Sequence, residues 1–318
     1  MGHLGNGDFL GVVGHCRTKA RTLATRAMPR VLQMAIHRQR HAQEASRDDR
    51  LWRLVLSEAA EFSRSEGGSA DVFRREVVPF IKRSVRCRKR FELYNGAHQF
   101  VLEAFLPRYR ERLYDYYREQ QYHMFVIMLS YPRSGLGTNY VEPYQLARRL
   151  LPELRVLDYG TGIPYGLVHA LVEDSSAVSA ATLVDLDLVH CRFAEFLLRR
   201  LAPDLKLVVH RLRNADEMPQ LGETFTFLFA KDIWEHLRDP QLVLEYVLGF
   251  ADEDCLCVLD ITHHGAEVHQ HITPDVGFIV QALTDAGFGH VADVGIMSGF
   301  ARGAPLRVYA ELTADSLR

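Results

Sequence analysis

The fold is decided by residues 155–166, which read RVLDYGTGIPYG. A short apolar run, Leu154–Tyr159, leads into a glycine-rich turn. Gly160 and Gly162 allow the backbone to turn tightly and to approach a ligand closely. In open α/β sheets, ligands bind at the carboxyl ends of the strands, where the strand order reverses. The stretch therefore predicts a strand, a ligand-binding turn and a helix in succession.

Short apolar runs alternate with amphipathic segments from residue 154 onward. We predict strands at Leu154–Tyr159, Ala181–Asp185, Leu205–Val209, Phe225–Ala230, Leu256–Ile261, His290–Ile296 and Arg307–Leu312. Helices are expected between the earlier strands, at Leu188–Leu201 and Gln241–Phe250. Such alternation predicts a parallel sheet of βαβ units. Because no helix separates the last two runs, we expect an antiparallel edge. The fold class is α/β: a Rossmann-like, mostly parallel sheet with an antiparallel edge, preceded by a helical N-terminal region.

The first part of the chain reads as helix at residues 17–65, at 98–128 and again at Tyr144–Leu151, with a loop at 131–139. We therefore expect a helical N-terminal region, residues 1–135, and a cofactor-binding domain, residues 136–318. The N-terminal region is predicted to cover the active site and contact the substrate, or to mediate homodimerisation. The candidates for substrate contact are Tyr131, Arg133, Asn139 and Tyr140, for which ordinary packing in the connecting segment is the alternative.

The composition of the 318 residues, 47% hydrophobic and 25% charged, is typical of a globular protein. No apolar run approaches the roughly 18 residues of a membrane-spanning helix. Basic residues follow the first apolar patch, at 9–13, instead of preceding it, which is the wrong order for a secretory signal. The five cysteines are scattered, and Cys255 and Cys257 are expected to be small buried residues. We predict a cytoplasmic protein that does not engage a membrane.

Charge is unevenly distributed along the chain. Residues 1–150 hold 26 basic and 15 acidic residues, whereas residues 151–318 hold 12 and 25. The basic half includes a run at 82–90 with six positive charges. Such a run can bind the phosphates of RNA. Alternatively, the basic and acidic halves attract each other, and the run at 82–90 is the solvated face of a helix.

The glycine turn does not complete the dinucleotide pattern G-x-G-x-x-G, because Tyr165 stands three residues after Gly162. Asp158 would repel a pyrophosphate and would suit a ligand that carries an ammonium group. The stretch resembles the first motif of class I S-adenosylmethionine (SAM)-dependent methyltransferases, a strand ending in D-x-G-x-G. That resemblance implies that the turn of Gly160 and Gly162 packs against the methionyl part of SAM and that Asp158 helps to hold its amino group. Pro164 replaces the third glycine of many members.

Later segments are similar to further motifs of the same family. The resemblance implies that Asp185, at the end of the second strand, accepts the ribose hydroxyls, with Asp187 as the rival. It also places the segment RNADEMP at 213–219 beside the adenine, which implies roles for Asn214 and Asp216. The segment KDIWEHLRDP at 231–240 resembles the family's fourth-strand motif, which implies that Lys231 lies at the cofactor site.

Methyl transfer needs alignment of the acceptor and, for some acceptors, a base. Glu235 and His236 follow the fourth strand, and His271 follows the fifth, so these three are the catalytic candidates. We predict that His236 or His271 assists deprotonation. The pattern D-x-x-E-H at 232–236, with a later histidine from the four in 263–271, also resembles the metal site of small-RNA 2′-O-methyltransferases. A divalent metal or a merely structural role for these histidines remains an alternative.

The sequence thus predicts a methyltransferase with SAM as cofactor, acting on oxygen or nitrogen of a small molecule. Two alternatives stay open. One is an RNA methyltransferase, with the basic run at 82–90 holding phosphates. The other is a non-catalytic scaffold with a SAM-binding fold.

Overall fold

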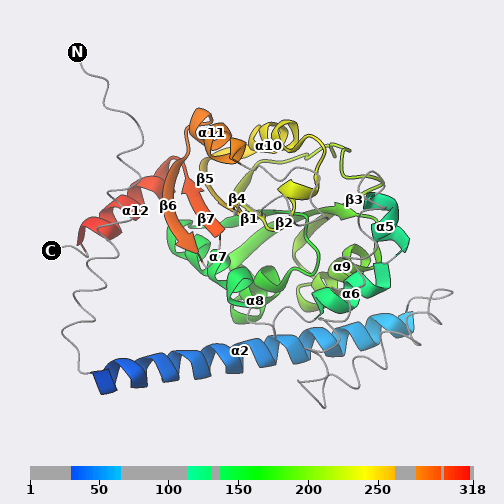
Figure 1. Cartoon of the computed structure of the whole chain (residues 1–318), viewed down its shortest axis with the longest axis horizontal. Coiled ribbons are helices and arrows are strands. Elements are labelled where there is room, and N and C mark those ends of the chain that lie inside the picture. Colours follow the sequence, from blue (N-terminus) through cyan, green and yellow to red (C-terminus); the bar gives the residue numbers. More distant parts are fainter. Residues whose placement is uncertain are drawn as a thin grey trace. The chain divides into compact units, whose positions relative to one another are not determined.

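The computed structural model describes residues 30–65, 113–119, 121–129, 137–261, 277–294 and 297–315 (Figure 1). The chain divides into two compact units. One comprises Met1–Arg47 with Glu311–Arg318, and the other, Asp48–Ala310, contains the sheet. Among the described helices, none combines the length and the apolar character needed to cross a membrane.

Seven strands form one sheet with the order β3-β2-β1-β4-β5-β7-β6. They are β1 (Leu154–Tyr159), β2 (Val178–Leu186), β3 (Lys206–Leu212), β4 (Phe225–Ala230), β5 (Ala251–Leu259), β6 (Gly289–Val294) and β7 (Met297–Ala301). The first five strands pair in parallel, whereas β7 is antiparallel to both β5 and β6. The predicted mostly parallel sheet with an antiparallel edge is confirmed.

The predicted strand at Arg307–Leu312 is wrong, because these residues belong to helix α12 (Ala304–Asp315). Within it, Leu306 and Tyr309 pack on the core at helical spacing. The edge is completed instead by β7, a strand that we did not predict. A Cβ at its central Gly299 would lie 3.2 Å from the carbonyl oxygen of Ala292, so the close pairing with β6 leaves little room for a side chain. Glycine has a low strand propensity, which hides this strand in the sequence.

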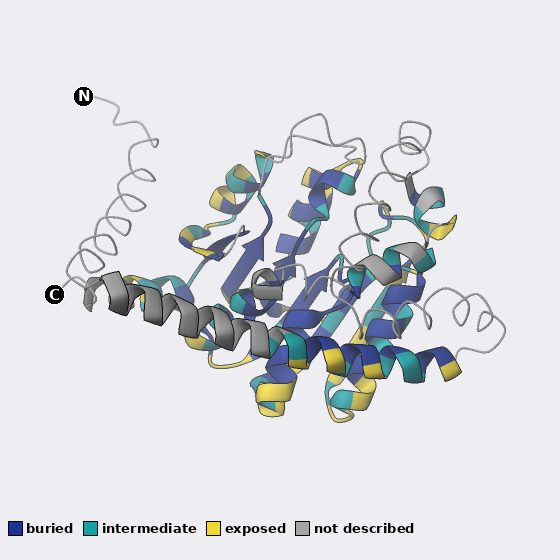
Figure 2. Cartoon of the chain, turned by 60° about the horizontal axis from the view of Figure 1, so that its bottom comes forward, coloured by how far each residue is buried: buried dark blue, intermediate teal, exposed yellow. Residues whose placement is uncertain are grey.

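Helices cover both faces of the sheet. On one face lie α7 (Gly137–Leu150), α8 (Tyr165–Glu173) and α9 (Val189–Leu201), and on the other lie α10 (Pro240–Leu248) and α11 (Phe278–Asp285) (Figure 1). The central strands serve both layers because successive side chains alternate between the faces. In β4, Phe227 and Phe229 join the first layer's core, whereas Leu228 and Ala230 join the second. Strand β4 is accordingly buried along its whole length (Figure 2).

Helix α6 (Gln121–Met128) and the part of α2 (Arg30–Ser65) after Asp48 pack on the first layer's core, whereas α5 (Leu113–Glu119) packs on the second layer's core through Tyr114. The predicted helix at 17–65 is present from Arg30 to Ser65, and Leu51, Val55, Ala59 and Phe62 are buried at helical spacing. Helix α7 begins at Gly137, so the end of the predicted loop at 131–139 is helical. Cys255 and Cys257 are buried in β5 as free thiols, as expected.

The strand order reverses between β1 and β4. From β1 the chain proceeds outward through β2 and β3, and from β4 it proceeds in the opposite direction through β5. Loops at the carboxyl ends of β1 and β4 therefore diverge, and ligands of open α/β sheets bind at such a point. This position falls at the glycine turn of residues 160–162.

Candidate functional site

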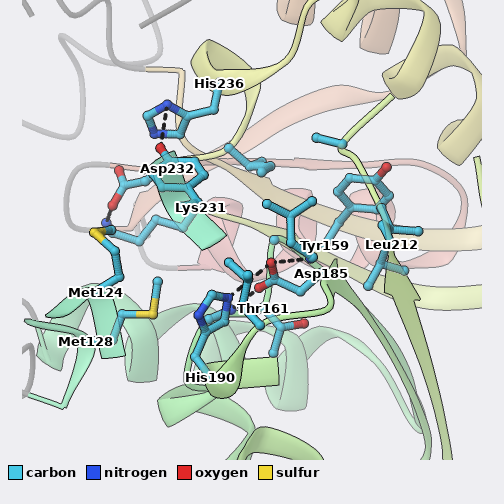
Figure 3. Close-up of a pocket in the computed structure, with 18 of the residues that line it drawn as sticks. Met124, Met128, Tyr159, Thr161, Asp185, His190, Leu212, Lys231, Asp232 and His236 are labelled. Atoms are coloured by element: carbon cyan, nitrogen blue, oxygen red, sulfur yellow. Dashed lines mark hydrogen bonds and ion pairs between the residues drawn. The ribbon is translucent and has the colours of Figure 1, made fainter. Parts of the chain in front are cut away.

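A cavity of about 440 Å³ opens at the carboxyl ends of β1, β2, β3 and β4 (Figure 3). Its volume lies within the range of small-molecule sites, roughly 300–1,000 Å³. The lining combines glycine backbone, apolar and aromatic side chains, and a few charged groups. Those discussed below are Tyr114, Tyr117, Met124, Met128, Tyr140, Gly160, Gly162, Asp185, Leu186, His190, Leu212, Ala215, Phe229, Lys231, Asp232, Glu235 and His236.

The glycine turn forms the wall at the end of β1. Gly160 and Gly162 have φ values of 73° and 54°, a left-handed backbone that other residues rarely adopt. The N–H of Gly160 donates to the carbonyl of Val184 on β2 at 2.8 Å. A Cβ at Gly160 would lie 2.9 Å from the Cβ of Ile233, so the loop after β4 packs directly on the turn. The predicted tight turn is present, and its binding of SAM stays a prediction.

Asp185 lies at the end of β2 and reaches into the cavity (Figure 3). One carboxylate oxygen accepts the N–H of Gly162 at 2.7 Å, and the other accepts the N–H of Leu186, also at 2.7 Å. The Nε2 of the buried His190 lies 3.3 Å from the same carboxylate. Asp187, the rival candidate, is not among the lining residues and faces Arg192 at 3.4 Å with an exposed side chain.

Asp158 lies beneath the turn and not at the cavity surface. It is 2% exposed, and the hydroxyl of Tyr144 donates to it at 3.2 Å. Burial, together with the nearby negative charge of Asp185, raises the pKa of Asp158 well above its usual value, although the hydrogen bond from Tyr144 opposes this. Its predicted contact with the amino group of SAM stays a prediction, since Asp158 does not line the cavity.

The segment predicted to flank the adenine contributes Ala215 to the cavity, beside Leu212 of β3. Asn214 turns to its own backbone, where its side-chain oxygen accepts the N–H of Asp216 at 3.0 Å. The carboxylate of Asp216 lies 3.8 Å from the guanidinium of Arg238. Neither Asn214 nor Asp216 lines the cavity, so their roles toward the cofactor also stay predictions.

Lys231 and Asp232 form an ion pair at the end of β4. Lys231 is buried, with its Nζ 5.1 Å from the ring centroid of Tyr140, a cation–π contact. Asp232 has a φ of 52°, a left-handed conformation that is strained for a residue other than glycine. Burial alone would raise the pKa of Asp232, but the Lys231 charge and hydrogen bonds with Lys231 and Asp260 hold it below its usual value.

The catalytic candidates Glu235 and His236 follow in the short helix η5 (Trp234–His236), and both line the cavity. The hydroxyl of Tyr117 lies 3.4 Å from the Nδ1 of His236, and the two rings meet edge to face. The Nε2 of His236 lies 4.0 Å from Glu235, a buried carboxylate. The hydroxyl of Tyr114 donates to the backbone carbonyl of His236 at 3.1 Å, which fixes the loop.

Several candidates lie outside the described residues: Tyr131, Arg133, His271, the histidines of 263–271 and the basic run at 82–90. For Asn139 the helix is described but its side chain is not, whereas Tyr140, the next residue on α7, lines the cavity. Within the part of the chain that is described, no group of three or more His, Cys, Asp or Glu side chains is placed to hold a metal ion. The later histidine of the metal alternative lies in 263–271, outside the described residues, so that alternative is not tested.

Some lining residues escaped the sequence analysis. Tyr114 and Tyr117 fall in the helical stretch predicted at 98–128 without a role at the site. Tyr114 is buried, yet both residues line the cavity. Met124 and Met128 of α6 line it as well, and so does His190. Their sequence spacing is that of ordinary packing residues, so only the tertiary structure reveals them. Asp232 was singled out only as a possible metal ligand, in the pattern D-x-x-E-H at 232–236.

No protein family model matches the chain, and no curated protein matches it either. Similar solved structures include the pyocyanin biosynthetic protein PhzM, at 16% identity and a TM-score of 0.41, covering 56% of this chain and 58% of that one. The CMeT domain of the citrinin polyketide synthase is 17% identical, with a TM-score of 0.43 and coverages of 56% and 55%. A SAM-dependent methyltransferase from Aquifex aeolicus is 17% identical, with a TM-score of 0.38 and coverages of 51% and 89%. The match thus spans little more than half of the first two chains. Each is a likeness of fold at low identity.

Proposed function

We propose that the chain is a SAM-dependent methyltransferase acting on oxygen or nitrogen of a small molecule. The observation that carries the proposal is the contact between Asp185 and the glycine turn. Because the carboxylate accepts the N–H of Gly162, the turn after β1 and the acid after β2 form one continuous wall of the cavity. These two elements are the ones that the family resemblance assigns to SAM.

The lining suits each part of SAM. The Asp185 carboxylate offers lone pairs beyond the two N–H groups that it already accepts, and these can accept ribose hydroxyls. Leu186, Leu212 and Ala215 provide an apolar surface for a flat base. Gly160 and Gly162 supply the left-handed backbone that the tight turn requires, and both residues line the cavity. When bound, SAM supplies a methyl group carried on a sulfonium.

The acceptor then occupies the part of the cavity between the end of β4 and helices α5, α6 and α7. There His236 is the candidate proton acceptor. Glu235, near Nε2, favours a proton on that nitrogen, which leaves Nδ1 to accept a hydrogen bond from Tyr117. A proton from the acceptor reaches Nδ1 either by displacing the Tyr117 hydroxyl or through it. His271 remains a second candidate outside the described residues.

Calorimetric titration with S-adenosylhomocysteine tests the proposal. We expect micromolar binding by the wild-type chain, and binding about tenfold or more weaker for Asp185→Asn, which loses charge but keeps its shape. The matched control is Asp187→Asn, two residues away and outside the cavity, which should bind like the wild type.

Absence of binding by folded wild-type protein would contradict the proposal and favour the scaffold alternative. Equal weakening in Asp185→Asn and Asp187→Asn would contradict the assigned site. The RNA alternative predicts a steep loss of affinity for single-stranded RNA as salt rises, which a parallel titration measures.

A further inference from the structure

We propose that Asp232 binds the acceptor and that the acceptor is an amine attached to an apolar, aromatic body. The inference rests on the proposed function, because it names the substrate class of the same cavity. Its first observation is that Lys231 and Asp232, the ion pair at the end of β4, differ in exposure. The side chain of Lys231 is 4% exposed, whereas that of Asp232 is 40% exposed and lines the cavity. Both residues line the cavity, but the carboxylate presents much more of its surface to a ligand than the ammonium group does.

The backbone holds Asp232 in this position at a cost. It is the non-glycine residue with positive φ among those described, and such strain persists only where surrounding contacts enforce it. Here the next residue provides that contact, because Ile233 packs against Gly160 of the glycine turn. The strained residue thus lies beside the turn, at the switch point between β1 and β4.

Two neighbouring side chains hold the Asp232 carboxylate in place. Lys231 pairs with it and contacts the ring of Tyr140, and the buried Asp260, which follows β5, donates a hydrogen bond to it as a protonated carboxyl group. The N–H of Asp260 donates to the carbonyl of Ala230 at 3.1 Å, which fixes the second carboxyl at the end of the adjacent strand. A carboxylate has about four lone-pair sites, and these two partners use two of them. The remaining sites are available to a donor in the cavity.

The charges favour an amine over a phenol or an acid. Asp232 and Glu235 both line the acceptor side, and the Lys231 charge is already paired. A phenol reacts as its anion, which these carboxylates would repel. An amine presents N–H donors and gains positive charge as it forms a new bond, so a nearby carboxylate stabilises it. Because the pKa of Asp232 is held low, this carboxylate is a weak base and a good binding partner for a cation.

The rest of the acceptor side is aromatic and sulfur-rich. Tyr117, Met124, Met128, Tyr140 and Phe229 line the cavity around the Lys231–Asp232 pair. Aromatic rings and methionine sulfur contact flat aromatic ligands favourably. An arylalkylamine matches both features, since its ring meets this wall while its nitrogen meets Asp232.

The test compares three probes of similar size: phenethylamine, phenethyl alcohol and hydrocinnamate. Their affinities are measured by calorimetry or ligand-observed NMR for the full chain saturated with S-adenosylhomocysteine. We expect phenethylamine to bind about tenfold or more tightly than hydrocinnamate, with the alcohol between them. Asp232→Asn should remove most of this preference. Asparagine tolerates the left-handed backbone, so the variant keeps its shape. Asp187→Asn, which removes a carboxylate outside the cavity, should keep the preference.

A second variant guards against local misfolding. Asp232→Gly also lacks the carboxylate but relieves the backbone strain, and it should lose the amine preference in the same way. The inference is overturned if hydrocinnamate binds as tightly as the amine, if none of the probes binds, or if both Asp232 variants keep the preference. Binding of S-adenosylhomocysteine is measured first on the same samples. Its absence refutes the proposed function, whereas its presence without an amine preference refutes the inference alone.

Discussion

Gly160 shows how one residue can connect the sheet to the cavity. Its N–H is bonded to β2, its φ is 73°, and its missing side chain leaves room for Ile233 after β4. Replacing its hydrogen by a methyl group therefore disturbs both the backbone and the packing of three neighbouring strand ends.

We predict that Gly160→Ala lowers the free energy of unfolding by about 1–3 kcal/mol, because left-handed backbone is costly for alanine and the Cβ overlaps Ile233. Urea denaturation measures this loss. Gly222→Ala is the control, since a Cβ at Gly222 meets nothing within 4 Å. An unchanged free energy in Gly160→Ala would mean that the turn relaxes freely and does not set the position of the loop after β4.

At the scale of residues, the sequence predicted those groups whose chemistry follows from local pattern. Gly160, Gly162 and Asp185 stand directly at the ends of apolar runs, so their place at the cavity could be expected. Tyr117 and His190 could not be found in this way. Their contribution depends on which face of a helix meets the sheet, and that is decided by packing between segments far apart in the sequence.

Among the elements, α2 contributes to the core through its residues after Asp48. Phe62 is 3% exposed, and its ring centroid lies 5.5 Å from that of Phe193 and 5.3 Å from that of Phe196, both on α9. The indole N–H of Trp52 donates to the carbonyl of Leu129 at 2.9 Å, just after α6. This stretch of α2 therefore belongs to the core of the unit that contains the sheet.

We predict that Phe62→Ala costs about 3–5 kcal/mol of unfolding free energy, as expected for a buried aromatic side chain. The control is Glu58→Gln on the same helix. Glu58 contacts Arg200 at 2.7 Å, but the arginine is 51% exposed, so the loss should be below about 1 kcal/mol. Equal losses in chemical denaturation of the two variants would contradict the assignment of α2 to the core.

The predicted helices and strands were most accurate where the spacing of apolar residues and the length of the segment indicated the same element. The parallel strands β1 and β4 have the predicted bounds, because both are buried at nearly every position and read as short, mostly apolar runs. The C-terminal edge was harder. The apolar residues at 307–312 fit the spacing of a helix as well as that of a strand. Strand β7 carries a glycine at its centre, so its pairing with β5 and β6, and not its own sequence, makes it a strand.

At the scale of the whole molecule, the buried Asp158 makes stability depend on pH. Its pKa in the folded state is raised above the usual 3.8, so between these two values the folded chain binds more protons than the unfolded chain. The free energy of unfolding contributed by this group therefore falls as pH rises through that window. Each pKa unit of difference corresponds to about 1.4 kcal/mol.

We predict that Asp158→Asn, which can still accept the Tyr144 hydroxyl, loses this contribution. Relative to the wild type, the variant should gain stability as pH rises from about 4 toward neutrality. Unfolding curves at several pH values measure the difference, and Asp187→Asn reports the effect of removing an exposed carboxylate. If the stabilities of wild type and Asp158→Asn change in parallel with pH, then folding does not raise the pKa of Asp158.

The left-handed backbone at Asp232 also limits how this position can change over generations. Aspartate, asparagine and glycine are the residues that accept such a φ at little cost, and the codons of the last two each differ from those of aspartate by a single base. One point mutation can thus delete the cavity's negative charge at this position without rebuilding the loop. If Asp232 selects amines, a descendant of this gene can alter its acceptor preference in one mutational step.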